Sequence, residues 1–153
     1  MSASTSTSKV IRARPEEVYE AFMNPAVLVD WLPPGEMTGK IHHFDARVGG
    51  GYRMSLFYPP TEGTQHGKTA EREDMVSVRF VELMPSRRIV EAVTFHTTDP
   101  SLMGVMTLVV MFEEVPGGTD VTIACTDLPP GVRPEDNETG SRESLEKLAK
   151  RFG

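Results

Sequence analysis

The sequence predicts an α+β domain in which an antiparallel sheet curls around one long C-terminal helix. Turn signals divide residues 37–126 into consecutive strand-like segments, and short links join such segments into an antiparallel meander. The end of the chain instead repeats apolar residues at helical spacing, which gives it one apolar face. A sheet and an amphipathic helix of this kind bury their apolar faces against each other.

The length and composition suit one globular domain over residues 1–153. The chain has 39% hydrophobic and 25% charged residues, enough for one core and without a linker or internal repeat. Residues 1–5 are small and polar, and we expect them to be frayed.

Charge and cysteine content exclude several classes of partner. A formal net charge of −6 disfavours binding to nucleic acid or anionic membranes, which require basic surfaces. No apolar run approaches the roughly 20 residues of a membrane span, and "MSASTSTSKV" lacks the pattern of a signal peptide. The lone Cys125 forms no intramolecular disulfide and fits a reducing compartment. We therefore expect a cytoplasmic monomer or homodimer without a cofactor.

The first elements are a strand and two short helices. Residues 9–13 can form the strand. In "RPEEVYEAFMNP", Pro15 suits a first helical turn, the two glutamates favour the positive end of the helix dipole, and Val18 and Phe22 start an apolar stripe. The Asn24-Pro25 pair ends this helix, "PAVLVDW" predicts a second one, and "LPPG" ends that.

Six more strands are expected, which makes seven in all. Their separating turns are "GGG", "PPTEGTQHG", "MPSR", "TTDPSLMG" and "VPGGTD", and the second of these is long enough to be mobile. The expected strands cover residues 37–48, 52–58, 71–83, 87–96, 105–115 and 120–126.

The last segment, "GVRPEDNETGSRESLEKLAKRFG", predicts the long helix. Pro134 lies near its start, acidic residues fill its first turn, and basic residues fill its last turn, as the helix dipole favours. Leu145, Leu148, Ala149 and Phe152 recur at helical spacing and form its apolar face.

The segment "KIHHFDARVGGGYRMSL" resembles a metal site or a phosphate loop, but a hairpin explains it better. With Gly49-Gly50-Gly51 as a turn at positive φ, one face becomes apolar. His42 then shares that face, whereas His43 and Asp45 lie on the opposite one, so the two histidines cannot bind one metal ion. No Lys-Ser/Thr follows the glycines, as a phosphate loop requires. The apolar face holds Phe44, Ala46, Val48, Tyr52, Met54 and Leu56.

Several motifs, in order, give the chain a family resemblance. They are "ARPEEVYEAFMNPAVLVDWLPPG", "FDARVGGGYRMSL", "VRFVELMPSRRIVEAVTF", "GVMTLVVMFEEVPGGTDVTI" and "ETGSRESLEKLAKRF". Together they resemble the activator-of-heat-shock-ATPase-homologue family, AHSA-type, within the START-like (SRPBCC) superfamily, which includes pollen allergens related to Bet v and polyketide cyclases. The resemblance implies a helix-grip fold with a deep cavity between the sheet and the last helix, where many relatives bind lipids or polyketides.

One position departs from the family. Where relatives commonly carry a tryptophan after a glycine of the last helix, this chain has Ser141 after Gly140. Either the cavity is larger at that point or a neighbour fills the space.

The apolar sides of the strands and helix supply the expected cavity wall. Ser141 and Glu138 precede Leu145 on the same helical side, where Glu138 either hydrogen-bonds a ligand at the cavity mouth or faces solvent. Tyr52 and His42 are the polar groups expected to orient a ligand. The expected wall residues are Trp31, Phe44, Tyr52, Met54, Phe80, Phe95, Met106, Leu108, Val110, Leu145 and Leu148.

These expectations leave three functions open. The first is binding of a small hydrophobic molecule, lipid-like or aromatic and polyketide-like. The second is a cyclase, dehydratase or hydrolase that uses the same cavity, although no catalytic motif is recognisable and no catalytic residue is predicted. The third is a co-chaperone-like interaction module, which would present an exposed apolar patch on the sheet.

Overall fold

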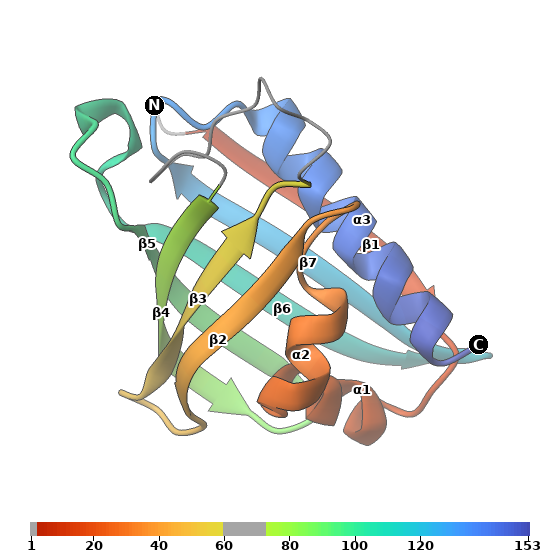
Figure 1. Cartoon of the computed structure of the whole chain (residues 1–153). Coiled ribbons are helices and arrows are strands. Elements are labelled where there is room, and N and C mark those ends of the chain that lie inside the picture. The colour runs from red at the N-terminus through yellow and green to blue at the C-terminus, as the bar shows by residue number, and fades with distance from the viewer. Residues whose placement is uncertain (1–2, 60–72) are drawn as a thin grey trace.

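The computed structural model describes residues 3–59 and 73–153, and it confirms the predicted fold class. The seven strands form one antiparallel sheet in the order β1-β7-β6-β5-β4-β3-β2, which bends around the C-terminal helix α3 (Figure 1). The short helices α1 and α2 cover one end of the sheet. The elements are β1 (Ala3–Ile11), α1 (Pro15–Met23), α2 (Pro25–Trp31), β2 (Thr38–Asp45), β3 (Gly51–Phe57), β4 (Glu73–Met84), β5 (Arg88–Phe95), the 3₁₀ turn η1 (Pro100–Leu102), β6 (Met106–Val115), β7 (Gly118–Leu128) and α3 (Pro134–Arg151).

The first strand corrects, for residues 3–5, the expectation that the N-terminus is frayed, and it also corrects the expected strand start at Lys9. β1 begins at Ala3, because it pairs with β7 along its length, with Thr5 opposite Cys125 and Ile11 opposite Thr119. Its backbone is therefore tied into the sheet. Residues 1–2 and most of the loop expected to be mobile, with its His66, lie outside the described residues.

The β2–β3 hairpin also differs from the predicted register. Asp45 lies opposite Gly51, so residues 46–50 form the connection, and Val48 is exposed rather than part of an apolar face. Positive φ occurs at Gly49 and Gly51 but not at Gly50. Gly51 is pressed against β4, where a Cβ atom would lie 1.8 Å from the Val78 carbonyl oxygen. The close approach of two strands therefore requires glycine at this position.

A β-bulge in β2 explains the remaining shift. It lies between Ile41, which pairs with Met54, and His43, which pairs with Arg53. The extra residue interrupts the strict alternation of side chains on which the predicted register depended. His42 is consequently exposed, and not on the pocket-facing side as predicted.

Aromatic side chains fill the end of the molecule that α1 and α2 cover. The ring of Phe22 packs edge-on against those of Trp31 and Phe112, at centroid distances of 4.7 and 5.3 Å. The Trp31 indole N–H donates a hydrogen bond of 3.1 Å to the Ala21 carbonyl oxygen. Asn24 caps α2 by accepting a hydrogen bond from the Ala26 N–H. This end is therefore a packed core.

Helix α3 lies along the concave side of the sheet, and its second half is part of that core. Leu145 and Leu148 are fully buried, as the helical spacing predicted. Two hydrogen bonds hold the segment that follows α2 against α3. The Ser144 hydroxyl donates to the Leu32 carbonyl oxygen, and the Lys147 ammonium donates to that of Pro33.

Candidate functional site

A cavity of about 290 Å³ lies between the first half of α3 and the sheet. Four strands supply its apolar wall, namely Leu56, Phe95, Leu108 and Ile123. The segment after α2 adds Leu32 and Pro34, the turn before α3 adds Gly131, Val132 and Arg133, and α3 itself adds Asp136, Asn137, Gly140, Ser141 and Ser144. The space is mainly apolar and partly open to solvent, as ligand pockets commonly are.

The cavity exists because one stripe of α3 carries small side chains. Asn137, Ser141 and Ser144 recur at helical spacing, and Leu148 continues the same stripe one turn further on. Gly140 lies beside the stripe, and the nearest side-chain atom to a Cβ placed there would be 3.8 Å away, in Pro34. Among the described residues no large side chain fills the gap, so the space beside Gly140 and Ser141 is open.

A small polar network borders the cavity at β1, β7 and α3. The Thr5 hydroxyl donates a hydrogen bond of 2.5 Å to the side-chain oxygen of Asn137. The Cys125 thiol also hydrogen-bonds with both of these side chains, but burial raises its pKa above the usual value. The thiol is therefore protonated at neutral pH and is a poor nucleophile.

Three of the predicted wall residues, Phe95, Leu108 and Ser141, line this cavity. Most of the others lie in the packed core, because the bend of the sheet closes over them. These core residues are Trp31, Tyr52, Met54, Phe80, Met106, Val110, Leu145 and Leu148. Glu138 is exposed on α3 and does not line the cavity, which agrees with the solvent-facing alternative and not with a ligand contact at the mouth.

Phe44 and Tyr52 form an aromatic cluster with Phe80 rather than a cavity wall. The rings of Phe44 and Tyr52 stack with centroids 5.3 Å apart, and Tyr52 lies 5.9 Å from Phe80. Burial, and then the nearby Glu91, raise the pKa of Tyr52 well above its usual value. Tyr52 is therefore a neutral phenol at physiological pH.

The two histidines of β2 are both exposed, and His42 Nε2 lies 2.7 Å from the Ser55 hydroxyl oxygen. Within the described ranges, no cluster of three or more His, Cys, Asp or Glu side chains is arranged to hold a metal ion. The same part of the chain contains no helix that is long and apolar enough to cross a membrane.

Sequence reasoning missed the most unusual interior group, Glu91 in β5. It is 7% exposed, and burial alone raises the pKa of its carboxyl to about 8. A signal was present in "RIVEAVTF", since Glu91 alternates with Ile89 and Val93 on the buried side of the strand. The stripe of small side chains on α3 was missed for a similar reason, because only apolar residues were expected to face inward.

The architecture is that of a helix-grip domain, and comparisons with known proteins agree. The family model described as "Activator of Hsp90 ATPase homolog 1-like protein" matches residues 12–153. The chain therefore belongs to this family.

Solved structures of bacterial proteins share the fold. Protein CV1439 from Chromobacterium violaceum is 31% identical in sequence and superposes with a TM-score of 0.84. The match covers 97% of this chain and 96% of CV1439. Protein Mll3558 from Rhizobium loti is 24% identical, covers 98% of this chain with 96% of its own, and has a TM-score of 0.73. No curated protein matches the chain.

Proposed function

We propose that this protein binds a small hydrophobic molecule, aromatic or lipid-like, in the cavity between α3 and the sheet. The supporting observation is the inward stripe Asn137, Ser141 and Ser144, which leaves about 290 Å³ beside an apolar sheet wall. Membership of a family with a ligand-binding fold supports the same proposal. Burying apolar ligand surface against this wall drives binding.

The space also limits the size of the ligand. A volume of about 290 Å³ lies at the lower end of the range for small-molecule sites. It suits a bicyclic aromatic molecule or a short acyl chain better than a long lipid. We further propose a reducing, cytoplasmic location, which the single cysteine supports.

We assign no catalytic residues for the alternative function, that of an enzyme. Acid–base chemistry in the cavity would require inward titratable groups within hydrogen-bond reach of each other. Tyr52 and Glu91 influence each other electrostatically, but no hydrogen bond joins them in the described part of the chain. We therefore assign neither of them a catalytic role.

An interaction surface on the sheet has weaker support. The exposed side chains of Met84 and Met111 lie on either side of Arg88 in the sheet register, and Arg88 forms an ion pair with Glu82. A charged pair thus separates these apolar groups, and we propose no protein partner for them.

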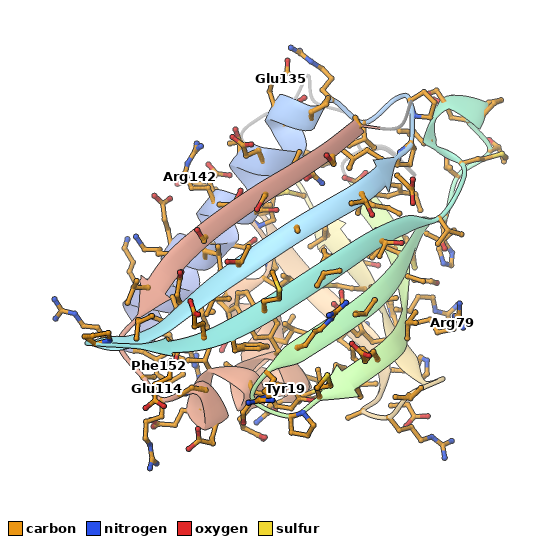
Figure 2. The ribbon with its side chains drawn as sticks, turned by 180° about the vertical axis from the view of Figure 1, so that it is seen from behind. Tyr19, Arg79, Glu114, Glu135, Arg142 and Phe152 are labelled. Atoms are coloured by element: carbon orange, nitrogen blue, oxygen red, sulfur yellow. The ribbon has the colours of Figure 1, made fainter. Side chains whose placement is uncertain are left out.

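The binding proposal is tested by filling the cavity. Ser141→Trp places a large ring in the space, whereas Arg142→Trp adds the same ring one residue away, where the side chain points into solvent (Figure 2). Saturation-transfer NMR measures the binding of naphthalene to each protein. We expect naphthalene to bind the unmodified protein and Arg142→Trp but not Ser141→Trp. Equal binding to all three proteins would place the ligand elsewhere. Native mass spectrometry of the freshly purified protein would show whether a metabolite accompanies it.

A further inference from the structure

Glu91 lies on the inner face of the sheet, next to the cavity wall. Its neighbours along β5 on that face, Ile89 and Val93, are buried, and Glu91 itself is only 7% exposed. Across the sheet it lies opposite Leu108 of β6, which lines the cavity, and opposite Phe80 of β4, which does not. Glu91 is not itself one of the residues that line the cavity, but its cross-strand neighbour Leu108 is, so the carboxyl group lies beside the cavity on its β5 side.

This carboxyl group has no partner among the described residues. It forms no hydrogen bond or ion pair with any of them. The ionisable groups that face it electrostatically are Tyr52 from β3 and Cys125 from β7, and both are neutral at physiological pH. With the pKa of Glu91 raised by burial to about 8, the group is mainly a neutral acid there, with one O–H donor to offer.

A buried acid without a partner weakens a fold, and leucine at this position would pack without that cost. Residues that lower the stability of a fold in this way are commonly found at ligand-binding or catalytic sites. We propose, on the basis of the binding function above, that Glu91 is the polar anchor of the cavity ligand and donates a hydrogen bond from its protonated carboxyl to a carbonyl oxygen. The ligand class is accordingly a small, neutral, mainly apolar ketone, ester or lactone.

The apolar, uncharged space around Glu91 favours a neutral ligand over a cation. An amine would bind by ionising Glu91, which would bury two charges in an apolar space where desolvation offsets much of their attraction. A carbonyl oxygen instead accepts a hydrogen bond from the O–H of the protonated carboxyl, and no charge is created. The Asn137 amide, which lines the cavity from α3, offers a further polar group to the same ligand.

Two probes of equal shape isolate this hydrogen bond. The first is 2-acetylnaphthalene, and the second is 2-isopropenylnaphthalene, in which a CH₂ group replaces the carbonyl oxygen. Dissociation constants are measured by NMR titration for the unmodified protein, Glu91→Gln, Glu91→Leu and Glu114→Leu. Glu114 is an exposed acid of β6, on the surface visible in Figure 2, and serves as the control.

We expect Glu91→Leu to weaken binding of the ketone about fivefold to tenfold, the range of one hydrogen bond between neutral groups, and to leave the hydrocarbon unchanged or tighter. In Glu91→Gln, whose amide also donates a hydrogen bond, the dissociation constant of the ketone stays within about threefold of that of the unmodified protein. Glu114→Leu changes the dissociation constant of neither probe. The carbonyl stretch of the bound ketone lies at lower frequency in the unmodified protein than in Glu91→Leu.

The outcomes separate this inference from the function on which it rests. If both probes bind but respond equally to Glu91→Leu, or if the carbonyl stretch of the ketone bound to the unmodified protein shows no hydrogen bond, the anchor is wrong while the cavity remains a binding site. If neither probe binds the unmodified protein, the binding function is overturned, and the anchor with it.

Discussion

The two halves of α3 face the same sheet but differ in what they bury. The second half inserts Leu145 and Leu148 into a core with no exposure, beside the aromatic cluster of α1 and α2. The first half presents Asn137 and Ser141 to the sheet, Ser144 follows at the start of the second half, and a cavity of about 290 Å³ remains. One helix thus anchors the fold with its C-terminal turns and leaves room for a ligand with its N-terminal turns.

The difference shows that side-chain size along one stripe, rather than the fold itself, decides where a helix-grip domain is hollow. The sheet residues opposite both halves are apolar. Replacing a few small residues of α3 by large ones would extend the packed core toward Pro134. The predictions that follow contrast these two halves.

The largest expected effect is truncation in the packed half. Leu148→Ala should lower the free energy of unfolding by about 2–5 kcal/mol, because a fully buried side chain leaves a void that the core only partly closes. Ser141→Ala, at the cavity wall, should change it by less than about 0.5 kcal/mol. Denaturant unfolding measures both. Similar costs at the two positions would mean that the halves do not differ in packing.

The next effect concerns the buried acid on the sheet beside the cavity. With the pKa of Glu91 raised from 4.5 to about 8, the folded chain keeps a proton that the unfolded chain releases above about pH 4.5. The contribution of Glu91 to the stability of the ligand-free protein should therefore be greatest below that pH and should fall up to about pH 8, by up to about 1.4 kcal/mol per pH unit.

Comparison with Glu91→Gln isolates this contribution from all other titrating groups. The free energy of unfolding of the variant should lack this added dependence on pH. Between about pH 5 and 7 it should fall by about 2–3 kcal/mol less than that of the unmodified protein. Denaturant unfolding at several pH values gives the difference. Parallel curves for the two proteins would show that Glu91 ionises normally in the folded state.

Enlarging a side chain should have opposite effects in the two halves. Ser141→Leu adds apolar surface to an open space and should stabilise the ligand-free protein by about 1 kcal/mol. Leu145→Phe overfills a packed region and should destabilise it by about 1–3 kcal/mol. Thermal unfolding of both variants gives the signs, and destabilisation by Ser141→Leu would indicate that the cavity is collapsed in solution.

The smallest effect is that of the glycine within the helix. Gly140→Ala should raise stability by about 0.5–1 kcal/mol, because alanine is the better helix former and its Cβ has 3.8 Å of clearance from Pro34. A loss of stability would reveal a close contact at this turn of α3.

The fold followed from the sequence because each level of the pattern agreed. Turn residues, alternating strands and one amphipathic helix each indicated the seven-stranded sheet and α3, and the family resemblance indicated the same arrangement. The hairpin register did not follow, because the connection takes up residues 46–50 instead of the three glycines alone, and the bulge between Ile41 and His43 adds one further residue of shift. The packing of Gly51 against β4 depends on tertiary contact that no local pattern encodes.

The candidate site was predicted only in part. Phe95, Leu108 and Ser141 lie at the cavity, but aromatic residues such as Trp31 and Phe80 were expected there and instead fill the core. The more informative signals were small residues at helical spacing and a single acid, Glu91, within a buried strand.

The central claim is that the first half of α3 and the sheet enclose a ligand. A crystal of the protein soaked with 2-bromonaphthalene tests it directly, because anomalous diffraction locates the bromine atom. The account predicts a bromine peak between Ser141 on α3 and the sheet residues Leu56 and Phe95. A peak only in the surface groove between α2 and β2, near Val29 and Phe44, or no peak on the protein, would contradict it.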